Sequence, residues 1–231
     1  MTYTVALGDP SYSSWSLRGW LLFARFNIPF TARFAPLGSA AFSEMMQEFA
    51  PARKVPAVNF GDVIIGDSLA IAEELASRHP DAGLWPDNPQ HRAIARSLAA
   101  EMHSGFLPLR RGYPMDLREA FAARPVDEDV AAELRRLEYI WDHARAACNS
   151  EGPWLCGAYC AADAFFAPVA ARIAGFGLKV SDSAAAYVTA HLNDPAFQDW
   201  RRIALADGPA RPEFSRDLPR RPWPVSAAEH P

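Results

Sequence analysis

The stretch that decides the fold runs from Lys54 to Ser68 and reads KVPAVNFGDVIIGDS. Its Val55-Pro56 pair can adopt a cis peptide bond, since the cis form costs an X-Pro bond only about 0.5–1 kcal/mol. A cis turn here would leave the amide and the carbonyl of Val55 unpaired, so that an extended ligand could pair with them as an added strand does. Residues 57–65 then have the pattern of a β-hairpin that turns at Gly61-Asp62.

Asp67-Ser68 follows this hairpin and begins a helical pattern that extends to about His79. The pair supplies a carboxylate, a hydroxyl and free amides at a helix start, where the helix macrodipole favours an anion. Taken alone, Val-Pro is typical of an ordinary turn and Asp-Ser of an ordinary helix N-cap. The prediction of a ligand site therefore depends on the order of the elements around these two pairs.

The residues before Lys54 predict alternating strands and helices. Tyr3–Leu7 is a β-prone run that ends at the turn cluster Gly8-Asp9-Pro10. A serine-rich turn leads from this strand into an apolar helical face, and we expect Ser16 to be the N-cap of that helix. A second strand and a short helix follow before Lys54, at residues 31–34 and 42–49.

This order of elements resembles the N-terminal domain of glutathione transferases, a thioredoxin-like fold, and the resemblance covers nearly the whole chain. The turn Ser13-Ser14-Trp15-Ser16-Leu17-Arg18 is similar to that of a bacterial serine-type branch and of zeta-class enzymes. The resemblance implies an α/β domain followed by an all-α domain, that is, a thioredoxin-like domain and a C-terminal helical bundle. We expect a glutathione-binding domain at residues 1–80, a linker at 81–90, an all-helical domain at 91–206 and a Pro-rich extended tail at 207–231.

Strand signals end with the first domain, and apolar residues at helical spacing take their place. They predict one long helix from Ile94 to Leu109, a second from Val130 to Cys148, a third from Asp163 to Ile173 and a short last one from Phe197 to Ala204. The charged and Pro-rich tail predicts an extended segment rather than a packed element.

The three cysteines, Cys148, Cys156 and Cys160, all lie in the second half of the chain. The first domain therefore has no thiol for redox or mixed-disulfide chemistry, and we expect the cysteines to be small buried hydrophobes. Residues 157–163 resemble the capping motif of transferases, with Cys160 at the hydroxyl position. Because sulfur is a poor acceptor, we expect Asp163 to cap this helix by accepting from the Cys160 amide.

The resemblance implies glutathione as co-substrate, without a metal, bound by Lys54, Val55, Asp67 and Ser68. Lys54 would pair with the glycyl carboxylate, although Arg53 stands where relatives often have glycine. A serine hydroxyl would stabilise the glutathione thiolate by donating a hydrogen bond to it. Ser13 is the first choice by the zeta-like register, and Ser14 is the alternative.

The electrophile would bind between the domains, against the serine turn and the first long helix. Arg18 would contact a substrate carboxylate or lie on the surface, and His103 would transfer protons or be structural. The residues predicted to form this pocket are Trp15, Arg18, Met102, His103, Phe106 and Arg110.

The composition and net charge of the chain limit the kinds of partner that it can bind. A formal net charge of −4 without a basic stripe argues against a nucleic-acid binder. With neither a charged leader nor about 20 consecutive apolar residues, the sequence predicts a cytoplasmic protein without a membrane partner. The resemblance also implies a homodimer in which the first domain of one subunit meets the helices of the other.

Three functions fit these observations. The first is a detoxifying transferase that joins glutathione to a small electrophile. The second is a glutathione-dependent cis-trans isomerase of the maleylacetoacetate type, which the Ser-Ser turn and Arg18 favour. The third is a non-catalytic module that uses the same fold for assembly.

Overall fold

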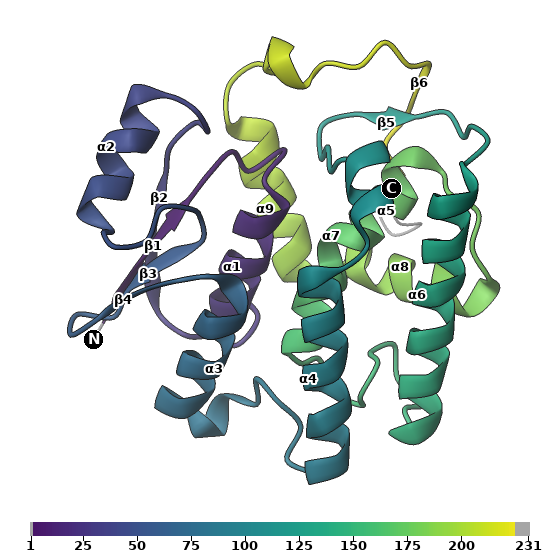
Figure 1. Ribbon diagram of the computed structural model, residues 1–231, viewed down its shortest axis with the longest axis horizontal. Helices are drawn as coiled ribbons and strands as arrows, with labels where there is room; N and C mark the ends of the chain where they lie inside the picture. The colour runs from purple at the N-terminus through teal and green to yellow at the C-terminus, as the bar shows by residue number, and fades with distance from the viewer. Residues whose placement is uncertain (1, 225–231) are drawn as a thin grey trace, which may run out of the picture.

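The computed structural model describes residues 2–224, which form a domain with a β-sheet followed by a helical domain (Figure 1). The sheet has the strand order β2-β1-β3-β4. β1 and β2 are parallel, whereas β3 is antiparallel to both β1 and β4. The strands are β1 (Tyr3–Leu7), β2 (Phe30–Phe34), β3 (Ala57–Asn59) and β4 (Ile64–Gly66).

Three helices complete the first domain: α1 (Ser14–Ala24), α2 (Ala40–Glu48) and α3 (Ser68–Arg78). α1 links β1 to β2, because parallel neighbours need a crossover connection rather than a tight turn. A mixed sheet with these helices is the predicted thioredoxin-like architecture, and the predicted fold class is confirmed.

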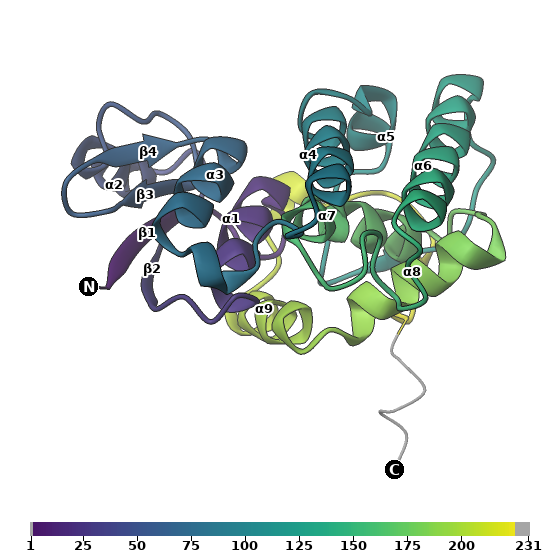
Figure 2. The same ribbon diagram turned by 90° about the horizontal axis from the view of Figure 1, so that it is seen from below.

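The helical domain is arranged around one buried helix. Its helices are α4 (Pro89–Ser104), α5 (Leu107–Gly112), α6 (Glu128–Ala147), α7 (Ala161–Phe176), α8 (Asp182–Asn193) and α9 (Pro195–Ala206). α7 packs against α1, α4 and α8, and Figure 2 shows it in the middle of the molecule. Every residue of α7 except Ala174 is buried, as expected for a helix that is apolar on all sides. None of the helices in residues 2–224 is both long and apolar enough to cross a membrane.

One prediction for this domain is wrong, because the helix expected from Ile94 to Leu109 is two helices. The break lies at Gly105-Phe106, where Phe106 has a left-handed backbone with φ 59°. Pro108 stands in the first turn of α5, where its missing N–H leaves no helical hydrogen bond unmade. Both helices turn apolar residues toward the same core, so the apolar periodicity continues across the break. α8 was also missed, because its alanine-rich sequence has a weak apolar pattern.

The predicted cap of α7 is confirmed. Asp163 Oδ2 accepts from the Cys160 amide at 2.9 Å, and its Oδ1 accepts from the Tyr187 hydroxyl at 2.8 Å. Burial raises the pKa of this carboxyl, and the hydrogen-bond donors around it offset part of that rise. Cys148, Cys156 and Cys160 are all buried and free of disulfides, as expected.

The segment after residue 206 is extended, but it packs against both domains, contrary to expectation. Arg211 bonds Asp9 and the Leu37 carbonyl, and Phe214 stacks on Tyr12 with ring centroids 4.3 Å apart. We call residues 207–224 the strap, and it includes the short helix η2 (Pro212–Phe214). The other short helix of this type, η1 (Pro80–Ala82), lies in the linker between the domains. The later part of the strap forms β6 (Arg220–Arg221), which pairs with β5 (Ala120–Phe121) and corrects the prediction that strands end with the first domain. Residues 225–231 of the predicted tail lie outside the described residues.

Candidate active site

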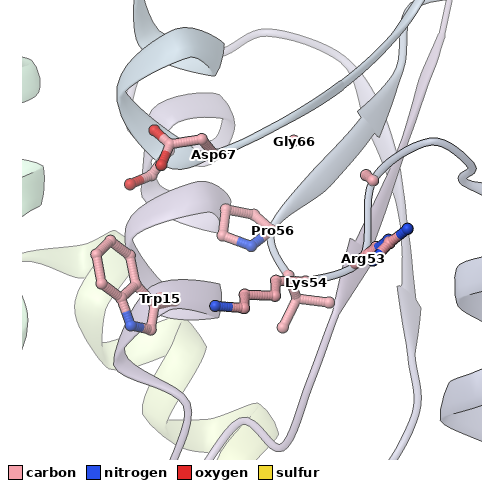
Figure 3. Close-up of a pocket in the computed structure, with 9 residues that line it drawn as sticks. Trp15, Arg53, Lys54, Pro56, Gly66 and Asp67 are labelled. Atoms are coloured by element: carbon pink, nitrogen blue, oxygen red, sulfur yellow. The ribbon is translucent and has the colours of Figure 1, made fainter.

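A cavity of about 380 Å³ opens where β4 ends and α3 begins (Figure 3). The four residues predicted to hold a ligand, Lys54, Val55, Asp67 and Ser68, all line it. Figure 3 shows Lys54, Asp67 and Trp15 around the same space. The other lining residues are Ala52, Arg53, Pro56 and Gly66.

The main chain of Val55 forms one wall of this cavity. The Val55-Pro56 peptide bond is cis, and within residues 2–224 neither the amide nor the carbonyl of Val55 has a hydrogen-bond partner. Pro56 packs directly on α1, where a Cβ added to Gly19 would lie 2.4 Å from the Pro56 Cβ. A ligand strand beside Val55 would therefore lie next to the N-terminal part of α1.

Asp67 and Ser68 form the wall at the start of α3. Asp67 is the N-cap, and its Oδ1 accepts from the Leu69 amide at 2.8 Å. Its φ of 74° is unusual for a residue with a side chain, and such backbone conformations concentrate at ligand sites. The Ser68 hydroxyl is fully buried and has no partner in the described part of the chain. The helix start thus carries a buried hydroxyl without a partner, on a residue that lines the cavity.

The serine turn uses its hydroxyls in different ways. Ser13, rather than Ser16, is the N-cap of α1, and its Oγ accepts from the Ser16 amide at 3.2 Å. The Ser13 hydroxyl also donates to Ser16 Oγ at 2.8 Å. Ser16 is buried inside the first turn and accepts from the Gly8 amide, which corrects its prediction as the cap.

Ser14 faces the other domain. Its Oγ accepts a hydrogen bond from Nη2 of Arg172 on α7, at 3.2 Å. Within residues 2–224 no acceptor is placed for the Ser14 hydroxyl proton, whereas the Ser13 proton is already engaged. The two serines therefore have different hydrogen-bond partners: Ser13 is bonded within its own turn, and Ser14 is bonded to the helical domain.

Of the six residues predicted for the electrophile pocket, three lie around a fourth, Trp15. The guanidinium carbons of Arg18 and Arg110 each lie 4.7 Å from the Trp15 ring centroid. His103 meets the same ring edge-on at 5.2 Å, and its Nε2 lies 3.1 Å from Asp67 Oδ2. Met102 and Phe106, in contrast, are buried in the hydrophobic core.

Arg18, Arg110 and Arg172 concentrate positive charge in this region, and the carboxylates near them, Asp67 and Glu133, form no salt bridge with them in the described chain. In the described chain none of the three forms a salt bridge, and Arg18 Nη1 and Arg172 Nε are buried without acceptors. Burial, with Arg110 and Arg172 nearby, lowers the pKa of Arg18 well below its usual value. Burial and Arg110 likewise lower the pKa of Arg172 to about 9. Such a cluster is suited to hold an anion.

Arg172 is the residue of this site that the sequence analysis missed. Its signal was an arginine inside the apolar run of residues 164–176, where a charged side chain has no evident place. Only the packing of α7 against α1 brings Arg172 to Ser14, across 158 positions of sequence.

Comparison with known proteins agrees with this geometry. Residues 12–78 match the model of the glutathione S-transferase N-terminal domain. Over 73 residues the chain is 41% identical to maleylacetoacetate isomerase of Rattus norvegicus, a match that covers 32% of this chain and 34% of the relative. Over 99 residues it is 35% identical to a probable maleylacetoacetate isomerase of Caenorhabditis elegans, covering 43% and 45%. The chain thus spans between a third and a half of the length of these relatives.

Solved structures extend the likeness to both domains. A glutathione transferase homolog from Burkholderia with bound glutathione aligns with a TM-score of 0.68 at 23% identity, covering 89% of this chain and all of the other. A maleylacetoacetate isomerase from Anaeromyxobacter dehalogenans aligns with a TM-score of 0.62 at 22% identity, covering 93% and 97%. At these identities the likeness concerns the fold. The molecule has the glutathione transferase fold, and its first domain matches the transferase N-terminal domain family.

The unpaired charge of Arg172 predicts a stability effect. Arg172→Met should stabilise the ligand-free protein by roughly 1–3 kcal/mol at neutral pH, because it removes a desolvated cation. The folded pKa of about 9 lies below the usual 12.5, so the cost of the charge is fully present below pH 9 and shrinks as pH rises above it. Thermal unfolding at pH 7 and pH 10 measures both effects. A lower melting temperature for the variant at pH 7 would show that the protein neutralises this charge.

Proposed function

We propose that this protein binds glutathione in the cavity beside Val55 and uses the glutathione thiolate to attack a small electrophile. The observation that carries the proposal is the meeting in one cavity of the unpaired Val55 main chain, the unpartnered Ser68 hydroxyl and the start of α3. The match of residues 12–78 to the transferase N-terminal domain supports it, because that match contains all three features.

Each part of the tripeptide has a complementary group in the cavity. The γ-glutamyl carboxylate would accept from the Ser68 hydroxyl at the α3 N-terminus, and its ammonium would pair with Asp67. The cysteinyl amide and carbonyl would pair with the main chain of Val55, as in strand addition. Lys54, an exposed lysine on the cavity wall, would pair with the glycyl carboxylate.

The thiol must lose its proton before it attacks. A free thiol has a pKa of about 8.5, and lowering it by two units needs about 2.7 kcal/mol of preference for the thiolate. A hydroxyl that donates to an anion supplies roughly 1.5–3 kcal/mol, so one serine can account for most of this. Ser13 would first have to give up its bond to Ser16, which costs about 0.5–1.5 kcal/mol. Ser14 is therefore the donor we propose, with Ser13 as the cap that shapes the turn.

Glutathione binding is the direct test. Calorimetry should show saturable binding of reduced glutathione at millimolar or lower concentration. Asp67→Asn should weaken binding tenfold or more, about 1.4 kcal/mol, because it removes the carboxylate charge but keeps an oxygen to cap α3.

Asp62→Asn is the matched control for that variant, since Asp62 is an exposed aspartate on the hairpin that pairs with Arg78 away from the cavity. Its dissociation constant should equal that of the unaltered protein. No heat and no thermal shift with millimolar glutathione would refute the proposed function as a whole.

The arginine cluster favours a second candidate, a cis-trans isomerase acting on a maleyl keto acid. The substrate of such an enzyme carries carboxylates, and Arg18 Nη1 and Arg172 Nε are buried donors without acceptors. In the isomerase reaction the thiolate adds to the conjugated double bond, the resulting single bond rotates, and expulsion of the thiolate restores the double bond. The curated relatives named maleylacetoacetate isomerase support this candidate.

An acceptor assay separates the candidates. We expect kcat/KM for a chloronitrobenzoate to exceed that for the neutral chloronitrobenzene by about tenfold. One charge-assisted hydrogen bond between the carboxylate and the arginines accounts for a difference of this size. Conversion of a maleyl keto acid to its trans isomer without consumption of glutathione would identify the isomerase. Equal rates for the charged and neutral halides would contradict a role for the arginines. Glutathione binding with no turnover of either kind would instead indicate the assembly module.

We also propose a homodimer with twofold symmetry, in which α3 of each subunit lies beside the helices of the other. The support is the transferase fold, because the glutathione transferases that this chain resembles form dimers of this kind. Light scattering at micromolar protein should give a mass twice the 25.4 kDa of one chain. A mass of one chain that persists as the protein concentration rises would refute the dimer.

A further inference from the structure

Arg172 has no structural role that explains its charge. The other charged residue of α7, Asp163, caps the helix, but Arg172 lies near the far end of α7 with a side chain only 4% exposed. Its Nη1 donates to the Pro168 carbonyl at 3.1 Å, and its Nη2 donates to Ser14 Oγ at 3.2 Å. Apart from the carbonyl of its own helix, its hydrogen-bond partner within residues 2–224 is thus a hydroxyl of the other domain.

The Ser14 hydroxyl is oriented by this contact. With an N–H donated into one lone pair, the oxygen keeps its proton free to donate elsewhere, and a cationic donor strengthens that proton as a hydrogen-bond donor. Ser14 precedes Trp15, which lines the glutathione cavity, and α1 packs on Pro56 through Gly19, so the turn that carries Ser14 lies next to that cavity.

The charges around Ser14 also favour an anion. Arg18 from α1 and Arg110 from α5 flank Trp15, and His103 from α4 approaches Asp67 at the start of α3. Asp67 is a carboxylate of this group, and its Oδ1 is engaged in capping α3. A thiolate beside Ser14 would therefore lie near three arginines, with Asp67 near Arg18 and Glu133 near Arg110 as the neighbouring carboxylates.

We propose that Arg172 is a positioning residue for thiolate formation: by donating to Ser14 Oγ it directs the Ser14 hydroxyl proton to the glutathione sulfur. This inference rests on the proposed function, since it concerns the same bound glutathione. The S–H bond breaks heterolytically, the proton leaves to solvent, and the sulfur keeps the electron pair that later attacks the acceptor. The contact joins the two domains, so that thiolate formation depends on their correct packing.

The competing role for Arg172 is direct binding of an acceptor carboxylate. In the absence of acceptor the route through Ser14 can be isolated: loss of positioning raises the pKa of bound glutathione only while Ser14 is present, whereas loss of the Arg172 charge alone raises it with or without Ser14. That pKa can be measured by the ultraviolet absorbance of the thiolate as pH is varied, with glutathione saturating and no electrophile present.

The experiment compares Arg172→Met with the unaltered protein. We expect the variant to bind glutathione with similar affinity but to raise the bound thiol pKa by about one unit, a tenfold loss of thiolate below that pKa. Ser14→Ala should raise it by a similar amount, and the double variant by no more than the larger single effect, because Arg172 acts through Ser14. Arg145→Met is the control, since Arg145 bonds main-chain carbonyls of residues 152–154 far from the site, and it should leave the titration unchanged.

The outcomes separate this inference from the proposed function. If the unaltered protein fails to bind glutathione, the proposed function fails and this inference with it. If it binds and ionises glutathione but Arg172→Met leaves the thiol pKa unchanged, only the inference is overturned. If the shift in the double variant equals the sum of the two single shifts, Arg172 does not act through Ser14, and the inference is again overturned. Should Arg172→Met not fold, Arg172→Lys decides the matter: a higher thiol pKa supports positioning by the guanidinium, and an unaltered pKa refutes it.

Discussion

The closeness of α1 to the Val55-Pro56 turn is the constraint on which the rest of the structure depends. A Cβ at Gly19 would come within 2.4 Å of Pro56, so the helix and the turn meet without a side chain between them. This approach places the serine turn, at the start of α1, beside the open main chain of Val55. It also leaves the opposite side of α1 free to pack on α7 and α9, which joins the two domains.

Electrostatics follows from that packing. Because α7 is buried between α1, α4 and α8, a charge on it loses its hydration, and Arg172 retains its cation at the expense of stability. Arg18 is in the same position on α1, fully buried and bonded to the Phe165 carbonyl. Two buried arginines without carboxylate partners are unfavourable in the empty protein and favourable when an anion is present. The domain interface is therefore suited to bind a negatively charged ligand, as the proposed function requires.

The strap after α9 contacts the first domain at the loop before α1. Arg211 reaches Asp9 and the Leu37 carbonyl, and the Arg211 amide donates to the Tyr12 hydroxyl. Asp9 and Tyr12 flank the serine turn on its N-terminal side, so the strap ties the loop that begins α1 to the helical domain. Asp9 is almost wholly buried, which makes its pairing with Arg211 necessary rather than incidental.

Local patterns in the sequence predicted most secondary-structure elements and most residues that line the cavity. Alternating and helical patterns of apolar residues located the strands and most helices. The Val-Pro pair and the Asp-Ser pair each form one wall of the cavity, and both were found from the sequence because each turn is defined by residues adjacent along the chain. Contacts between segments that are distant in sequence could be seen only in the folded molecule. The sequence pattern did not reveal the break at Gly105-Phe106, because apolar residues on both sides of it pack into one core. The β6 strand of the strap pairs with β5, about 100 residues away in the sequence. The contact of Arg172 with Ser14 depends on how α7 packs against α1, and no local pattern in either helix contains that information.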